Sequence, residues 1–134
     1  MQTKKETNLI YDQEINILIA EDSLVNQKVI SAMLEKLGVS FEIAQNGAQA
    51  VSMFKDGDFD LILMDIRMPE LSGIDATKII RNHEVSGTQI PIIALTANAT
   101  AGDRNQYHNA GMNDHVPKPI DLHNLAEAIS KWLK

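Results

Sequence analysis

Short apolar runs alternate along the chain with segments in which apolar residues recur at helical spacing. Such runs are typical of strands buried in a parallel sheet, and the recurring positions are typical of helices that pack on it by one face. The predicted strands cover residues 17–20, 41–44, 59–64 and 91–95, and a brief fifth strand closes at Val116. The predicted helices cover residues 25–37, 46–54, 74–81, 98–110 and 121–133. This alternation predicts an α/β fold with a parallel sheet, helices on both faces and right-handed crossovers.

The apolar positions also indicate which side chains hold each helix to the sheet. They are Val25, Val29, Ile30, Met33, Leu34 and Leu37 in the first helix, Ala48, Val51 and Phe54 in the second, and Leu122, Leu125, Ile129 and Leu133 in the last. The helix over 98–110 differs, because its apolar face consists only of alanines and Tyr107, and Gly102 lowers its helix propensity by ~1 kcal/mol. We expect this helix to be loosely held.

The length of 134 residues fits one domain, which we place at 14–134 after a flexible, polar leader or linker over 1–13. The absence of cysteine excludes disulfides and thiolate metal sites, so a metal would need oxygen or imidazole ligands. A net charge of −6 without a basic cluster argues against direct binding of nucleic acid. Because the chain shows neither a secretory signal nor an apolar run long enough to cross a bilayer, we expect a cytoplasmic domain without membrane contact.

Polar side chains follow four of the five predicted strands at their carboxyl ends. They are Glu21 and Asp22 after the first strand, Asp65 after the third, Thr96 after the fourth and Lys118 after the fifth. The functional crevice of an open parallel sheet lies beyond these ends, so we expect the five residues to converge. By contrast, Asp56, Asp58 and Asp60 precede the third strand, which places them at the opposite edge in a solvated turn.

Three converging carboxylates would repel one another and raise one another's pKa values unless a cation lay between them. Oxygen ligands with room for water suit Mg²⁺, and Mn²⁺ could substitute for it. Carboxylates, a divalent cation, a hydroxyl and an ammonium group together are what phosphoryl transfer requires, because the transferred group carries negative charge that must be neutralised. Asp65, in the middle of the cluster, would be the nucleophile.

These residues and their surrounding motifs resemble the receiver domains of two-component response regulators over about residues 14–134. The motifs are Glu21-Asp22 after the first strand, Asp65 in LILMDIRMPELSG, Thr96 in IIALTA, and Lys118-Pro119 in VPKPI. The resemblance implies a flavodoxin-like, doubly wound (βα)₅ fold with five parallel strands in the order 2-1-3-4-5. It also implies that the domain signals rather than acts as an enzyme, although it assists its own phosphorylation and dephosphorylation.

The resemblance further implies a role for each site residue. Asp65 would receive a phosphoryl group from a phosphohistidine on a histidine kinase or a histidine-phosphotransfer protein. Asp22, Asp65 and the backbone carbonyl of Arg67 would bind Mg²⁺ directly, and Glu21 would act mainly through water. Thr96 and Lys118 would bind the phosphoryl oxygens, the small Ala97 would leave room for the phosphoryl group, and the Lys118-Pro119 bond would be cis.

Two segments, EDSLVNQKVISAMLEKLG and GMNDHVPKPID, are most similar to the receivers of hybrid sensor histidine kinases. Such receivers pass the phosphoryl group to a histidine-phosphotransfer domain, whereas other response regulators use it to control an effector. No effector follows Lys134, so we expect either an excised part of a larger kinase, such as the cytoplasmic part of a membrane-bound hybrid kinase, or a free-standing receiver. We expect a monomer or a weak dimer that depends on phosphorylation.

Phosphorylation is expected to draw the Thr96 hydroxyl toward the new charge and to shift the face formed by the helix over 98–110, the fifth strand and the last helix. Family members usually carry Tyr or Phe three residues before the lysine, where this chain has His115. His115 could swing in their place and make the switch depend on pH, or it could be an ordinary surface imidazole.

Three other kinds of protein were considered, because each has a similar strand pattern or some of these site residues. A haloacid-dehalogenase-like phosphatase would need a second aspartate where this chain has Arg67. A flavodoxin-like carrier of a flavin or nucleotide would need a phosphate-binding loop rich in Ser, Thr or Gly after the first strand, where the chain has EDSLVN. A receiver that docks without being phosphorylated would not need the intact set of Asp65, Thr96 and Lys118.

Overall fold

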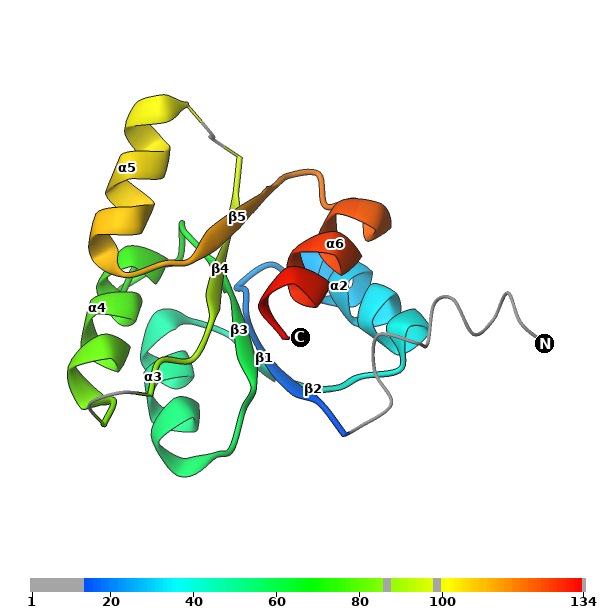
Figure 1. The fold of residues 1–134 in the computed structure, drawn as a ribbon, viewed down its shortest axis with the longest axis horizontal. Coiled ribbons are helices and arrows are strands. Elements are labelled where there is room, and N and C mark those ends of the chain that lie inside the picture. Colours follow the sequence, from blue (N-terminus) through cyan, green and yellow to red (C-terminus); the bar gives the residue numbers. More distant parts are fainter. Residues whose placement is uncertain (1–13, 86–87, 98–99, 134) are drawn as a thin grey trace.

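A computed structural model describes residues 14–85, 88–97 and 100–133. Its strands are β1 (Asn16–Ala20), β2 (Ser40–Ala44), β3 (Leu61–Asp65), β4 (Ile92–Thr96) and β5 (Asp114–Pro117). Its helices are α2 (Leu24–Leu37), α3 (Gly47–Asp56), α4 (Gly73–His83), α5 (Ala101–Ala110) and α6 (Leu122–Trp132). The strands are parallel and lie in the order β2-β1-β3-β4-β5 (Figure 1), so the predicted flavodoxin-like (βα)₅ topology is confirmed.

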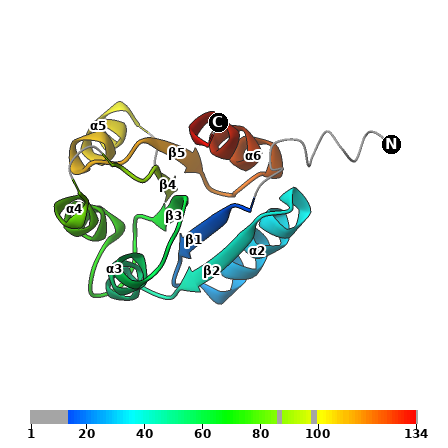
Figure 2. The same ribbon diagram turned by 60° about the horizontal axis from the view of Figure 1, so that its bottom comes forward.

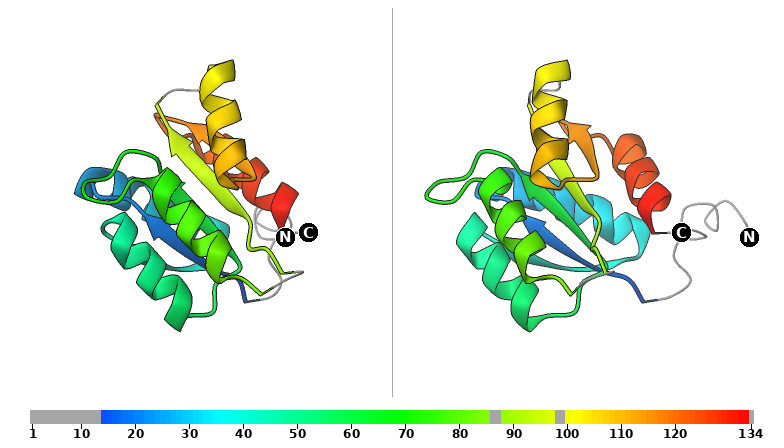
Figure 3. Two further views of the ribbon diagram at one scale, coloured as in Figure 1. Left: turned by 90° about the vertical axis from the view of Figure 1, so that its left-hand side faces the viewer. Right: turned by 60° about the vertical axis from the view of Figure 1, so that its left-hand side comes forward.

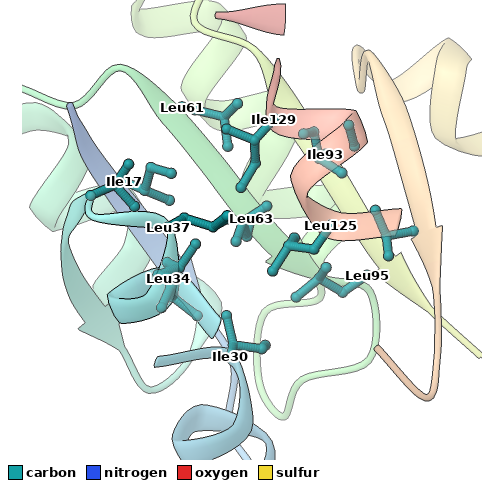
Figure 4. Close-up of a cluster of buried hydrophobic side chains, with 14 residues drawn as sticks. Ile17, Ile30, Leu34, Leu37, Leu61, Leu63, Ile93, Leu95, Leu125 and Ile129 are labelled. Carbon is teal, nitrogen blue, oxygen red and sulfur yellow. The ribbon is translucent and has the colours of Figure 1, made fainter. Parts of the chain in front are cut away.

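The sheet separates two apolar cores. Helices α2 and α6 cover one face, and α3, α4 and α5 cover the other (Figures 2 and 3). On β3 the alternation is visible within the strand, since Leu61 and Leu63 face the α2 and α6 side while Ile62 and Met64 face the other side. Figure 4 shows the first core, in which strand side chains pack against α2 and α6. Burial on both faces explains why the central strands are continuous apolar runs.

Two helices bury most of the predicted positions against the sheet, but not all of them. In α2 the buried stripe runs through Gln27, Ile30, Leu34 and Leu37, and Val25 is 70% exposed. Val29 is also exposed, because Gln27 occupies the inward position in the first turns and donates to the Glu21 carbonyl over 2.7 Å. In α3 the buried residues are Gly47, Ala50 and Val51, Phe54 is partly buried and Ala48 is exposed. The prediction that Val25, Val29 and Ala48 face inward was wrong.

The remaining helices agree better with the prediction. Helix α6 is capped by Asp121, whose carboxylate accepts from the His123 amide, and buries Leu125 and Ile129 as expected. Helix α5 begins at Ala101 after the cap residue Thr100, so the predicted start at residue 98 lies outside the described residues. Its buried side chains are Tyr107 and Ala110. Such a narrow apolar contact is what a loosely held helix would have.

None of the helices in the described part of the chain combines the length and the apolar character that a membrane span requires. The Lys118-Pro119 peptide bond is cis, as the resemblance implied.

Candidate functional site

The strand ends bring the predicted residues to one edge of the sheet. Pairing of Ala20 with Met64 places the residues after β1 beside Asp65, the last residue of β3. Asp65 is paired with Leu95, so Thr96 follows directly at the end of β4. The chain after β5 joins the same edge, because the Lys118 amide donates to the Thr96 carbonyl over 2.8 Å. Parallel pairing alone therefore gathers side chains that lie far apart in the sequence.

A charged cluster occupies this edge. The Lys118 ammonium lies 2.8 Å from Asp65 Oδ1 and 3.4 Å from Glu21 Oε1. One carboxylate oxygen from each of Glu21, Asp22 and Asp65 lies within 4.8 Å of the others. Glu21 and Asp65 are buried, whereas Asp22 is exposed. Of the other acidic residues considered, Asp58 and Asp60 are exposed in the turn before β3, as predicted, and Asp56 is exposed at the end of α3.

The N-terminal end of α2 fixes Glu21. Glu21 Oε2 accepts from the Ser23 amide over 3.1 Å and from the Asn26 side chain over 3.5 Å. The buried Gln27 side chain holds the Glu21 carbonyl. The sequence reasoning missed Asn26 and Gln27, although a polar Gln27 in line with the apolar stripe was a signal that could have found it. These contacts leave Glu21 Oε1 turned toward Lys118.

Burial and neighbouring charges perturb the titration of this cluster. Burial, opposed by the hydrogen bond from Lys118 and assisted by the negative charges of Glu21 and Asp22, raises the pKa of Asp65 from 3.8 to about 6. Burial lowers the pKa of Lys118, but the hydrogen bond and charge of Asp65, together with Glu21, outweigh it and hold that pKa above 10.5. The site therefore carries a permanently charged ammonium against carboxylates that repel one another.

The donor set fits a hard divalent cation. Within the described residues, the buried Glu21 Oε1 has no hydrogen-bond partner, and its contact with Lys118 is the longer of the two ion pairs. A buried carboxylate oxygen that has only this longer ion pair would be stabilised further by a second cation beside it. Three convergent carboxylates, one of them exposed, offer oxygen ligands and leave room for water, which suits Mg²⁺.

The loop between β3 and α4 is tied closely to Asp65. The Gly73 amide donates to the Ile66 carbonyl over 2.9 Å, and a Cβ on Gly73 would collide with the backbone carbonyl of Asp65. Within the loop, Glu70 has a φ of 69°, in the left-handed region. The exposed Arg67 belongs to this loop. A groove of about 590 Å³ runs from here to α5, and its lining includes Asp22, Arg67, Met68, Ser72, Asp103 and Tyr107.

The two predicted switch residues have different surroundings. Thr96 is 3% exposed, and its hydroxyl forms a 2.7 Å hydrogen bond with the hydroxyl of Tyr107 from α5. His115 is half-buried and pairs with Ala94. Ala97 is exposed directly after Thr96. The contact with Tyr107 had no signal in the sequence, where that residue was assigned only to the apolar face of its helix.

Known proteins are similar to this chain in sequence and fold. Residues 17–130 match the response regulator receiver domain family. Hybrid signal transduction histidine kinase I of Dictyostelium discoideum is 43% identical over 120 residues, which are 85% of this chain and 7% of that protein. The receiver domain of the Pseudomonas aeruginosa sensor histidine kinase PA1611, crystallised with a magnesium ion coordinated in its active site cleft, is 45% identical with a TM-score of 0.82. The match covers 90% of this chain and 98% of that domain.

The Saccharomyces cerevisiae response regulator Ssk1 is a third relative. Its receiver domain, crystallised with the histidine phosphotransfer protein Ypd1, is 37% identical with a TM-score of 0.83, covering 90% of this chain and 89% of that domain. This chain spans 20% of complete Ssk1. The phosphatase and flavin-carrier alternatives gain no support from these matches. The family match and the relatives agree with the fold and the strand-end residues: the chain belongs to the response regulator receiver domain family, the signalling domains of two-component phosphorelays.

Proposed function

We propose that Asp65 accepts a phosphoryl group from a phosphohistidine in a reaction that needs a divalent cation, preferably Mg²⁺. The observation that carries this proposal is the 2.8 Å contact between Lys118 and a buried Asp65, inside a cluster with two further carboxylates. Glu21, Asp22, Asp65 and the backbone carbonyl of Arg67 would hold the cation. When bound, it neutralises negative charge on the oxygens of the transferring group.

The chemical step is an in-line displacement at phosphorus. A carboxylate oxygen of Asp65 forms a bond to phosphorus as the bond from phosphorus to the imidazole nitrogen breaks, and the electron pair stays on the imidazole, which takes a proton from solvent. A pKa of about 6 leaves Asp65 mostly ionised at neutral pH, as a nucleophile must be. Lys118 and Thr96 would then bind phosphoryl oxygens. The reverse step delivers the group to the histidine of a phosphotransfer domain.

The direct test is phosphorylation by a small donor. Incubation with acetyl phosphate and Mg²⁺ should give a labile adduct of one phosphoryl group by mass spectrometry, and Asp65→Ala should form none. Asp58→Ala is the matched control, because Asp58 is an exposed aspartate at the opposite edge of the sheet. Equal labelling of the Asp65→Ala variant, or full labelling without a divalent cation, would sink the proposal. An unlabelled wild-type protein would favour a receiver that docks without phosphorylation.

The first turns of α2 are the surface we assign to the phosphotransfer partner. Leu24 and Val25 are 66% and 70% exposed, Val29 is 40% exposed, and the helix starts two residues after Asp22. Exposed apolar side chains in a group are typical of a protein interface. Their place beside the acceptor carboxylate suits a histidine-phosphotransfer domain, the kind of partner with which the Ssk1 receiver was crystallised.

Docking and chemistry can be separated by one substitution. Val25→Asp should slow transfer from a phosphorylated histidine-phosphotransfer domain without changing labelling by acetyl phosphate. Val85→Asp is the control, since Val85 is equally apolar and 74% exposed but follows α4, away from the site. If both variants slowed transfer alike, α2 would not be the docking surface.

A further inference from the structure

A hydrogen bond between two buried hydroxyl groups joins helix α5 to the site. Thr96 Oγ1 and the Tyr107 hydroxyl lie 2.7 Å apart, and the two residues are 3% and 5% exposed. Tyr107 also packs in the same apolar cluster as Met64 and Ala94, which precede Asp65 and Thr96 on their strands. Since Tyr107 and Ala110 are the buried side chains of α5, this ring is a main attachment of the helix.

Tyr107 occupies the region in which an aromatic ring at position 115 would act. The pairing of Ala94 with His115 puts His115 on the sheet face shared by Ala94 and Thr96, because side chains alternate along a strand. His115 and Tyr107 line the same small cavity, about 120 Å³, between α5 and β5. The hydroxyl that reaches Thr96 in this protein therefore comes from α5.

We propose that Tyr107 is a positioning residue for Thr96. It holds the Thr96 hydroxyl in the unphosphorylated protein and releases it when Thr96 turns toward the phosphoryl group on Asp65. The inference rests on the proposed function of Asp65. Turning the Thr96 oxygen toward Asp65 moves it out of the 2.7 Å contact with the Tyr107 hydroxyl. The hydrogen bond thus belongs to one state of the switch, and breaking it loosens the attachment of α5.

Two hollows that Tyr107 helps to line adjoin helix α5. The groove of about 590 Å³ beside the site is lined by Tyr107 together with Asp103 and Gln106 of the same helix. The cavity shared with His115 lies toward β5. The ring itself is buried, but both hollows adjoin α5, so a shift of this helix that follows a change at Thr96 has open volume beside it.

Beryllofluoride, which mimics a phosphoryl group on a carboxylate in the presence of Mg²⁺, tests the inference. Tyr107→Phe keeps the packed ring and removes the hydroxyl, so it takes the hydrogen bond to Thr96 away from the unliganded state. We expect this variant to bind beryllofluoride about 5-fold more tightly, which is the factor that a hydrogen bond of typical net strength gives. In the metal-free protein, amide exchange over Ala101–Ala110 should be several-fold faster than in wild type, and exchange in β1 should not change.

Double variants distinguish positioning from a general structural effect. The gain in beryllofluoride affinity from Tyr107→Phe should vanish in a Thr96→Ala background. It should return in a Thr96→Ser background, which restores the hydroxyl. Unchanged or weaker binding by Tyr107→Phe, or a gain that persists in the Thr96→Ala background, would overturn the inference. If wild-type protein fails to bind beryllofluoride with Mg²⁺, the proposed function itself fails. If wild type binds and only the Phe effect is missing, Tyr107 alone loses its role.

Discussion

Replacing Asp65 with asparagine should stabilise the metal-free protein at neutral pH while abolishing phosphorylation. The ionised carboxylate is buried beside two other carboxylates, and these surroundings raise its pKa from 3.8 to about 6. Asparagine has nearly the same shape and no negative charge, and its side-chain oxygen can still accept from Lys118. The substitution therefore removes the repulsion while keeping most of the packing.

The size of the effect follows from the pKa. The difference between 3.8 and about 6 corresponds to roughly 3 kcal/mol. Because the folded-state pKa is raised, the protonated Asp65 contributes stability below about pH 4, and that contribution is lost as the pH rises through about 6. Some attraction to Lys118 is lost with the charge, so we expect Asp65→Asn to gain about 1–3 kcal/mol above pH 7 and almost nothing near pH 4.

Urea unfolding in EDTA, followed by the fluorescence of the single tryptophan, Trp132, measures this difference. Asp58→Asn is the matched control, because Asp58 is exposed in the turn before β3 and should leave the stability unchanged at both pH values. Addition of Mg²⁺ should stabilise wild type more than Asp65→Asn and so reduce the gap. Equal or lower stability of Asp65→Asn at neutral pH without metal, or a gain that persists at low pH, would refute the reasoning.

Three further substitutions test other parts of the structure. Glu70→Gly should raise the free energy of unfolding by up to about 1 kcal/mol, because a φ of 69° is strained for glutamate. The same change at Glu35, inside α2, should lower it by about 1 kcal/mol, and thermal unfolding measures both effects. Arg81→Met should lower the free energy of unfolding, measured in urea, by about 2–4 kcal/mol, because it removes the guanidinium that lies 2.8 Å from the largely buried Glu84 carboxylate. A loss smaller than that caused by the same substitution at an exposed lysine would contradict this. His115→Ala should alter phosphotransfer kinetics differently at about pH 6 and about pH 8, and identical kinetics would mark it as an ordinary surface imidazole.

The sheet and the acidic cluster could be predicted because both depend on local sequence. An apolar run predicts a buried strand whatever its neighbours are, and the residue at its carboxyl end is then placed by the topology. Asp65 and Thr96 follow from this rule together with the strand order. Lys118 joins them because β5 ends at the same edge, where its backbone also bonds to Thr96. The resemblance to a family then added roles that position alone leaves open.

Helix faces and side-chain partners could not be predicted in the same way. The buried stripe of α2 is set by where the helix meets the sheet, and Gln27 takes an inward position because a carbonyl at Glu21 needs a donor there. From helical spacing alone, Val25 and Val29 were predicted to be buried like the other apolar residues of α2, but both are exposed. The hydroxyl pair of Thr96 and Tyr107 depends on how α5 lies against β4, and eleven positions of separation carry no information about that distance.

The formal charges of the site bear on how a bound cation and Lys118 would act together in the proposed phosphorylation. The three carboxylates and the Lys118 ammonium sum to −2, so a divalent cation brings the unphosphorylated cluster to neutrality. Phosphorylation replaces the carboxylate charge of Asp65 with about −1.5 to −2 on the phosphoryl oxygens, which leaves up to about one excess negative charge. The charge of Lys118 is already included in this sum, so neutral hydrogen-bond donors at the same edge must stabilise the excess negative charge. A hydroxyl that can turn, such as that of Thr96, would be such a donor, and in the proposed switch its movement would couple the added charge to helix α5.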